Sequence, residues 1–172
     1  MLGDRWGVSV AETQRPYPCD DFVTSPVLTA WRAVHIDVPA EAVWPWVAQV
    51  RLGPYSYDWI DNLGRRSPAE LMDLPEPEVG ERFTTVRGRQ RGRIVSVDKG
   101  HQLTGRIGGA FMSYVLVPEA GGTTRLLLKV VLRTRRWFAV GLSVGDLVMA
   151  RRQLLNLKRL AEGQHNRSTA PD

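Results

Sequence analysis

The chain has 172 residues, of which 43% are apolar and 24% are charged, and it carries a formal charge of +5. This composition is ordinary for a globular protein, and the length fits one domain that buries roughly 70% of its unfolded surface. It excludes a disordered chain and, because no run approaches about 18 apolar residues, an integral membrane segment.

Residues 1–28 show no regular period and contain three prolines, so we expect an irregular amino-terminal arm. They also lack the apolar core of a signal peptide. Cys19 is the only cysteine, which excludes an intrachain disulfide and favours a reducing, cytoplasmic compartment. Asp20 and Asp21 beside it disfavour the thiolate, so we expect Cys19 to be inert.

A strand is predicted from Trp31 to Asp37, and Pro39 then opens a helix. Apolar residues recur at three- and four-residue spacing along this helix, at Val43, Trp46, Val47 and Val50. Pro45 removes one backbone donor and should bend or loosen the helix. Gly53 and Pro54 end it.

Residues 43–64 contain three of the six tryptophans and two of the four tyrosines, a density of rings that the rest of the chain must enclose. The piece after the helix is predicted as a turn or a short helix that Gly64 caps. Another short helix is predicted to begin at Ser67–Glu70, because a proline follows its first residue and further prolines soon end it.

From Gly80 the apolar period changes to two, which predicts strands joined by glycine-bearing turns. The predicted strands are 82–87, 92–98, 102–107, 110–117 and 123–134. Residues 143–162 then form an amphipathic helix, and we expect a disordered tail over 163–172. The order of elements predicts an α+β fold in which a curved, antiparallel six-stranded sheet surrounds a long carboxy-terminal helix, with one domain over 29–162.

Several segments together resemble the START-like superfamily, whose bacterial members are often called polyketide cyclase/dehydrase-like or SRPBCC proteins. The resemblance covers about residues 28–162, through VPAEAVWPWVAQV, YSYDWIDNLGRRS, VGERF, VDKGHQL and YVLVPEAGGTTRL. It implies a helix-grip fold of the START and Bet v 1 type, with a cavity between the sheet and the long helix. Members bind hydrophobic small molecules there, and some catalyse cyclisation or dehydration without one shared catalytic motif.

The resemblance implies a set of residues that line this cavity and bind a lipid- or polyketide-like molecule. They are Trp46, Tyr55, Tyr57 and Trp59 at the mouth, Met112, Tyr114, Leu128 and Val130 on the strands, and Arg151 on the last helix. Tyrosine suits such a pocket because it offers an apolar face and a polar end. Two alternatives stay open: the aromatic residues are plain core, and Arg151 extends its charged end to solvent.

A catalytic hypothesis rests on Asp58, with Asp61 the other acid of the aromatic stretch. A carboxylate buried beside rings has a raised pKa and can act as a general acid or base, here with Tyr55 or Tyr57. The alternative function is therefore a cyclase- or dehydrase-type enzyme. Equally, both acids can pair with the nearby arginines or cap the following turn.

Other chemistry lacks a motif in this sequence. His35, His101 and His165 are scattered, so no metal is predicted, and phosphate-binding glycine motifs are missing, so no cofactor is predicted. Alternate arginines over residues 87–93 could form a phosphate-binding stripe, but too few rings accompany them to stack on bases. We interpret them as a charged sheet edge, predict a small-molecule partner and no nucleic acid, and leave a homodimer open.

Overall fold

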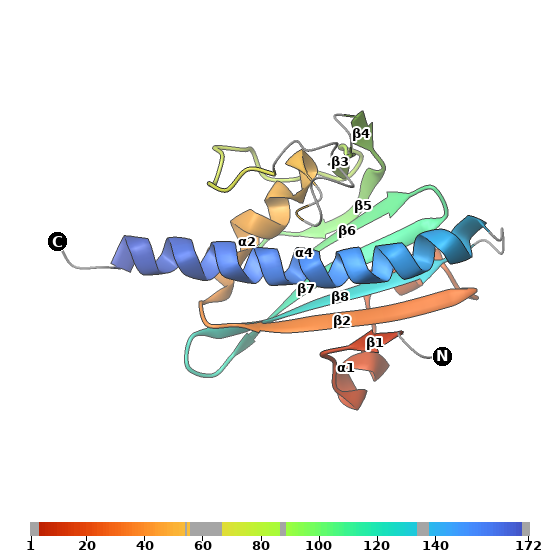
Figure 1. Ribbon diagram of the computed structural model, residues 1–172, viewed down its shortest axis with the longest axis horizontal. Coiled ribbons are helices and arrows are strands. Elements are labelled where there is room, and N and C mark those ends of the chain that lie inside the picture. Colours follow the sequence, from red (N-terminus) through yellow and green to blue (C-terminus); the bar gives the residue numbers. More distant parts are fainter. Residues whose placement is uncertain (1–3, 54, 56–66, 87–88, 134–137, 170–172) are drawn as a thin grey trace.

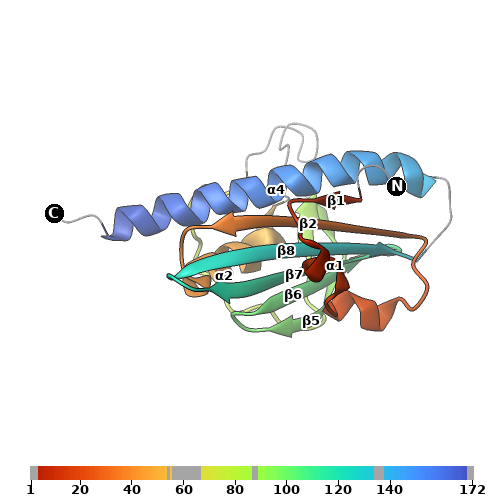
Figure 2. The same ribbon diagram turned by 90° about the horizontal axis from the view of Figure 1, so that it is seen from below.

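The computed structural model describes residues 4–53, 55, 67–86, 89–133 and 138–169. Among them, one sheet is covered on one face by a long helix and on the other by the amino-terminal arm (Figure 1; Figure 2). The α+β architecture predicted from the order of the elements is confirmed.

The main sheet contains six strands in the order β1-β2-β8-β7-β6-β5. Neighbouring strands are antiparallel except β1 and β2, which run parallel. The strands are β1 (Arg5–Trp6), β2 (Leu28–Ile36), β5 (Arg93–Asp98), β6 (Gln102–Ile107), β7 (Ala110–Glu119) and β8 (Thr123–Leu132). Because β8 lies inside the sheet and both of its faces are covered, most of its side chains are buried.

Three strands differ from the sequence prediction. The arm, expected to be irregular, supplies β1 at the sheet edge, so the sheet is mixed. The strand predicted over 82–87 instead forms β3 (Thr84–Val86), which pairs with β4 (Arg89–Arg91) in a separate hairpin. Gly92, with φ +68°, turns the chain from β4 into β5 close against the backbone of Arg106. Arg91 and Arg93 therefore lie in different sheets, which divides the predicted arginine stripe.

The first predicted helix forms as α2 (Ala40–Ala48) and continues into a 3₁₀ turn, η2 (Gln49–Leu52). The carbonyl of Pro39 accepts the first helical hydrogen bonds. Pro45 lies inside α2, and the helix continues through it before tightening at its end. The buried side of α2 carries the predicted apolar stripe, including Val43, Trp46 and Val47, each 0% exposed.

The short helix predicted to begin at Ser67–Glu70 does not form, and residues 67–78 contain no helix or strand. The side chain of Gln49 holds this segment extended. It donates to the carbonyl of Glu70 at 2.8 Å and accepts from the backbone N–H of Met72 at 2.8 Å. Those bonds use backbone groups that a helix would need, and Pro68, Pro75 and Pro77 remove further donors.

Alternating side chains divide the sheet into two faces. The face that α2 and α4 cover, called here the helix face, includes Val34, Ile36, Leu103, Tyr114, Leu116, Leu126, Leu128 and Val130. The opposite face, called here the arm face, includes Ala33, Phe111, Val115, Leu127 and Val131, packed against Tyr17, Cys19 and Val23 of the arm. Burying each large apolar side chain contributes about 1.5–3 kcal/mol, so both coverings contribute to stability.

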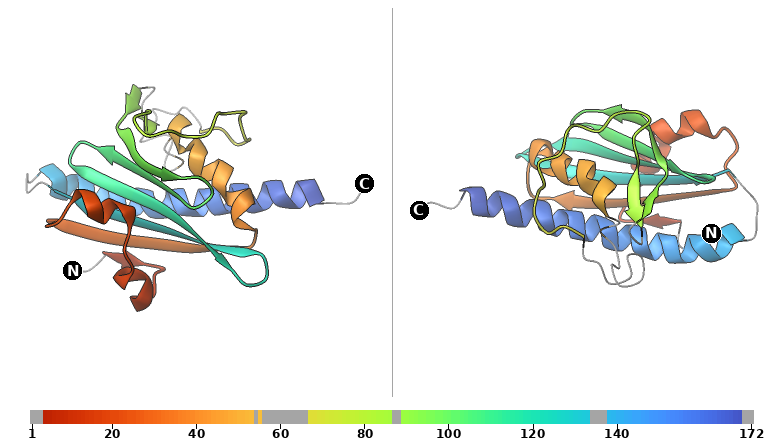
Figure 3. Two further views of the ribbon diagram at one scale, coloured as in Figure 1. Left: turned by 180° about the vertical axis from the view of Figure 1, so that it is seen from behind. Right: turned by 90° about the horizontal axis from the view of Figure 1, so that it is seen from above.

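The arm has more regular structure than its sequence predicts. It forms α1 (Val10–Gln14) and a 3₁₀ turn, η1 (Pro18–Phe22), which lies across the arm face (Figure 3, left). Ser9 caps α1 by accepting from the N–H of Glu12, whose carboxylate accepts in return from Ser9 N–H. These local bonds explain order in a segment without hydrophobic periodicity.

The long helix α4 (Phe138–Thr169) is longer at both ends than the predicted 143–162 segment. It lies across the helix face and projects beyond the sheet towards the carboxy terminus (Figure 1; Figure 2). Lys158 connects α4 to the end of β2, because its amine lies 2.7 Å from the His35 carbonyl. The same amine lies 3.0 Å from the carboxylate of Glu162, four residues further along the helix. Residues 163–169, expected to be a disordered tail, continue the helix.

Candidate ligand-binding site

Trp46 is the centre of a cluster of rings under α4. Its side chain is 0% exposed, and its ring lies 6.5 Å from that of Tyr55, at 84°, in an edge-on contact. Its indole N–H is buried and has no hydrogen-bond acceptor among the described residues. Because indole nitrogen can only donate, an acceptor from outside the described residues is needed to satisfy it.

Tyr55 is held by bonds from two helices. Gln49 donates to its hydroxyl at 2.7 Å, and Asn156 of α4 donates to its backbone carbonyl at 2.8 Å. Its φ of 52° lies in the left-handed region, which costs a residue with a side chain roughly 1 kcal/mol or more. The two bonds fix this conformation and keep the ring 2% exposed beside Trp46.

Tyr114 joins the sheet to α4 through a second buried polar contact. Its hydroxyl donates to the side-chain carbonyl of Gln153 at 2.6 Å, and both residues are buried. The Phe83 ring lies 6.3 Å from the Tyr114 ring. Phe83 in turn rests on the backbone of β6, because a Cβ at Gly105 would overlap its ring. A glycine at that position is therefore needed for the ring to reach the sheet.

Most of the polar side chains in this cluster are uncharged. Among the described residues, the buried polar side chains include glutamines, threonines, a serine, an arginine and a lysine, but no carboxylate. The lysine, Lys129, belongs to the arm face, where it pairs with Asp20 at 2.6 Å. The arginine, Arg32, lies opposite Leu128 on the helix face and donates to the backbone carbonyls of Asp4 and Trp31. The hydrogen bonds between side chains in the cluster join uncharged groups, Gln49 with Tyr55 and Tyr114 with Gln153. Such a surface suits an uncharged, mostly apolar molecule rather than an ion.

The structure brings together most of the predicted lining residues that it describes. Trp46, Tyr55, Tyr114, Leu128 and Val130 all belong to the buried core of the helix face, and half-buried Met112 packs against it. Arg151 does not join them. It is exposed, and its guanidinium lies 4.6 Å from the centre of the Trp6 ring, which is the alternative in which the charged end extends outward. Tyr57, Asp58, Trp59 and Asp61 lie outside the described residues.

Sequence reasoning missed four residues of the cluster: Phe83, Gln49, Gln153 and Asn156. Glutamine and asparagine side chains usually face solvent, so only the positions of these three residues in the sequence could have indicated that they contribute to the cluster. Gln49 follows the apolar stripe of α2, and Gln153 directly precedes the fully buried Leu154 in α4.

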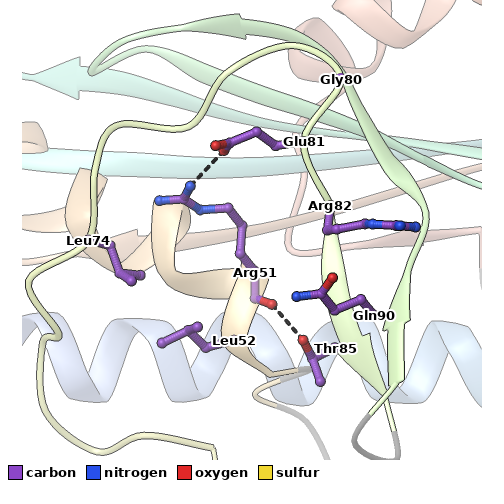
Figure 4. Close-up of a pocket in the computed structure, with 8 residues that line it drawn as sticks. All are labelled: Arg51, Leu52, Leu74, Gly80, Glu81, Arg82, Thr85 and Gln90. Carbon is purple, nitrogen blue, oxygen red and sulfur yellow. Dashed lines mark hydrogen bonds and ion pairs between the residues drawn. The ribbon is translucent and has the colours of Figure 1, made fainter.

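An open pocket of about 360 Å³ lies elsewhere, between η2, the segment around Leu74 and the β3–β4 hairpin (Figure 4). It is lined by Arg51, Leu52, Leu74, Gly80, Glu81, Arg82, Thr85 and Gln90. None of the residues predicted to line the internal cavity lines this pocket. Those that the structure describes are instead closely covered, since Trp46, Tyr55, Tyr114 and Leu128 are each at most 2% exposed.

The described residues show neither a reactive thiol nor a metal site. Burial raises the pKa of the Cys19 thiol to about 11, which opposes formation of a nucleophilic thiolate. Within the described ranges, no three His, Cys, Asp or Glu side chains are grouped so as to hold a metal ion. None of the described helices combines the length and the apolar content needed to cross a membrane.

Comparison with solved structures identifies the architecture. An AHSA1-like protein from Aeromonas hydrophila is 21% identical, with 84% of this chain and 99% of that chain covered and a TM-score of 0.51. A Staphylococcus saprophyticus protein is 14% identical over 80% of this chain and 93% of that chain, with a TM-score of 0.53. A Nitrosospira multiformis protein is 12% identical over 80% and 99%, also with a TM-score of 0.53. The fold is a helix-grip fold.

In this helix-grip chain, α4 is the gripped helix and the sheet wraps one side of it (Figure 2). The START-like fold predicted from the sequence motifs is confirmed. No protein-family model matches the sequence, and no curated protein matches it. At these identities the structural neighbours establish the fold alone, so function must come from the chain's own residues.

Proposed function

We propose that this protein binds a hydrophobic or amphiphilic small molecule between α2, α4 and the helix face. The observation that carries the proposal is the buried indole N–H of Trp46, which lacks an acceptor among the described residues. Such an unmet donor costs about 1–3 kcal/mol, and native structures keep few of them. A ligand oxygen that accepts this N–H removes the cost.

The walls around Trp46 supply the rest of the binding free energy. Tyr114, Leu128 and Val130 offer apolar surface, at roughly 25 cal/mol per Å² removed from water. Because these side chains are closely packed, the ligand has to displace some of them as it enters. Met112 suits this role, since it is half-buried, unbranched and able to adopt several rotamers. The ligand is therefore expected to associate more slowly than a ligand that enters an open pocket.

Trp31 provides an internal comparison, because its indole N–H is also buried without an acceptor. Its ring, however, lies between two cations: Arg5 is 5.6 Å and Lys129 is 5.4 Å from the ring centre. These cation–π contacts stabilise the Trp31 ring in its observed position. Trp46 has no cation–π contact among the described residues, so only at Trp46 does a missing acceptor point to a ligand.

The experiment compares two probes that differ in one oxygen, 2-acetylnaphthalene and 2-ethylnaphthalene. We expect the ketone to bind more tightly, and Trp46→Phe to weaken it about fivefold or more, the equivalent of one hydrogen bond. The matched control, Trp31→Phe, should leave its affinity unchanged. Equal affinity for both probes, or equal losses in both variants, would contradict the proposal. Native mass spectrometry of protein from its own host then identifies the molecule that it carries.

The enzymatic alternative is not supported by a specific observation. Asp58 and Tyr57 lie outside the described residues, so the hypothesis that they act as an acid–base pair stays untested. The hydroxyl of Tyr55 is already bonded to Gln49, and no carboxylate is buried in the described part of the chain. We therefore propose binding and assign no reaction.

A further inference from the structure

The amino-terminal arm is held on the arm face by ion pairs between its acids and basic side chains of β8. Glu12 pairs with Arg125 at 2.7 Å, and Asp20 pairs with Lys129 at 2.6 Å. The two basic residues are four positions apart in β8, so their side chains lie on the same face of the sheet. On this face, basic side chains of the sheet therefore receive an acidic segment of chain.

Three exposed arginines continue this basic pattern beyond the arm and are called here the arginine patch. Arg106 of β6 lies directly opposite Phe111 of the arm face and, on its other side, directly opposite Arg93 of β5. Residues directly opposite on neighbouring strands share a face. Arg133 follows four residues after the paired lysine of β8, and its N–H donates to the Gly109 carbonyl at 3.0 Å. The alternation of side chains thus extends to Arg133.

No carboxylate pairs with the arginine patch in the described part of the chain. The side chains of Arg106 and Arg133 make no hydrogen bond or ion pair with other described residues, and Arg93 donates to the Gly80 carbonyl at 2.7 Å. Asp21 is an exposed acid of η1, but it pairs with none of them. Like charges directly opposite each other, such as Arg93 and Arg106, destabilise a sheet. The patch therefore lacks the anionic partner that Arg125 and Lys129 have.

An aromatic pair lies beside the arginine patch. Phe22 of η1 stacks on Phe111, with ring centres 5.4 Å apart and planes inclined by 8°. The arm covers Phe111, which is 4% exposed, whereas Phe22 is 39% exposed and offers its outer face to an apolar group. Figure 2 shows η1 and the end of β8 at the same end of the sheet, away from the projecting end of α4.

We propose that the arginine patch and Phe22 bind an acidic segment of a partner protein, in which carboxylates flank one apolar side chain. The carboxylates pair with Arg106 and Arg133, whose planar guanidinium groups match two carboxylate oxygens. The apolar side chain packs on Phe22. Arginine and aromatic residues are enriched in protein interfaces, and arginine clusters recognise acidic motifs. The arm itself binds β8 through the same chemistry.

A single-stranded nucleic acid fits this surface less well. Its successive bases need a series of exposed rings on which to stack. Among the described rings of the arm face, only Phe22 is exposed. An acidic peptide needs one such ring and a few cations, which is what Phe22 and the arginine patch supply.

The test is an NMR titration with a short acetylated peptide in which a central phenylalanine is flanked by aspartates. We expect the backbone amide signals of Arg106 and Phe111 to shift, and the same peptide with asparagines to bind at least tenfold more weakly. Arg106→Gln should weaken the aspartate peptide about tenfold, and a central alanine in the peptide should weaken it about fivefold. The matched control, Arg159→Gln, removes an exposed arginine of α4 on the other side of the sheet and should change affinity less than twofold.

The protein without peptide gives a second readout, of opposite sign. Because Arg106 lies opposite Arg93, Arg106→Gln should raise the midpoint of urea denaturation while it weakens the peptide. Equal peptide affinity in wild type and Arg106→Gln, or equal losses in Arg106→Gln and Arg159→Gln, would overturn the proposal. Oligothymidylate or phosphatidylserine vesicles that bind more tightly than the peptide, and lose affinity in Arg106→Gln, would overturn the assignment of a protein partner.

Discussion

The two coverings of the sheet are held by different forces. On the arm face, charged groups make the attachment: Lys129 pairs with Asp20 at 2.6 Å, and Arg125 pairs with Glu12 at 2.7 Å. In the core under α4 the bond of 2.6 Å between Tyr114 and Gln153 joins two neutral groups, and the charged contacts of Lys158 with Asp37 and Glu162 lie at the end of β2. The arm should therefore respond to pH and salt, whereas the helix covering should respond to changes in shape and to uncharged ligands.

The two faces of the sheet also differ in what they contribute to stability and to ligand binding. On the arm face the apolar side chains are already covered by the arm, and the ion pairs help to hold this covering in place. The helix face combines apolar walls with uncharged donors and acceptors, which is the composition of small-molecule sites. Substitutions on the two faces test this division.

Gly105→Ala should be the most damaging change, at about 3 kcal/mol of unfolding free energy. The added methyl group would overlap the buried Phe83 ring, which has little space to move. Urea denaturation measures the loss. Gly163→Ala in α4 is the control, because a Cβ there meets only the flexible end of Arg167, and it should stabilise the helix by up to about 1 kcal/mol. A Gly105→Ala loss below 1 kcal/mol would mean that the helix face is loosely packed.

Tyr114→Phe should cost about 2 kcal/mol, because the Gln153 carbonyl loses a buried donor. The double variant Tyr114→Phe/Gln153→Leu should recover part of this loss, since both polar partners are then gone. Unfolding free energies of the four proteins give the coupling directly. Losses that simply add would show that the bond does not stabilise the folded protein.

Glu12→Gln should have the smallest effect, about 1 kcal/mol at pH 7. The hydrogen bond from Arg125 holds the pKa of Glu12 below its ordinary value of 4.5. A lowered folded-state pKa means that the contribution is fully present above about pH 4.5 and disappears as the pH falls through the folded value. Urea denaturation at pH 7 and pH 3 should therefore show a smaller difference between wild type and variant at pH 3 than at pH 7.

Glu78→Gln is the matched control for this experiment, because it removes an exposed carboxylate whose side chain makes no bond with the other described residues. It should leave stability unchanged at both pH values. Equal stability of Glu12→Gln and wild type at pH 7 would mean that the Arg125–Glu12 pair does not help to hold the arm, and this part of the contrast between the two coverings would disappear.

Periodicity predicted the parts of the fold that bury one regular face. Strands β2 and β5 to β8 and helix α4 were recognised because their apolar residues recur at the spacing of a strand or a helix. Short elements could not be predicted from periodicity. Strand β1 has two residues, and the arm is ordered by caps and ion pairs that leave no periodic trace. The separation of the β3–β4 hairpin depends on a turn at Gly92 that only the packing against β6 requires.

Residues of the candidate site likewise divide into those that periodicity predicts and those that it does not. Trp46, Tyr114, Leu128 and Val130 were predictable, because large apolar side chains on an inward stripe must meet. Gln49 and Gln153 were not, since a glutamine on a helix usually faces water and its burial depends on one partner across the core. The outer pocket was equally hidden, because its lining comes from a segment without regular structure and from a detached hairpin.

The position of Cys19 gives the protein a reporter of its own motions. Cys19 lies in η1 of the arm, is 0% exposed against the sheet, and donates its backbone N–H to Ser113 of the sheet at 2.9 Å. A maleimide can reach it only when the arm lifts, and the chain has no second cysteine to react. The labelling rate of the unmodified protein therefore measures how often the arm detaches, separately from any opening under α4.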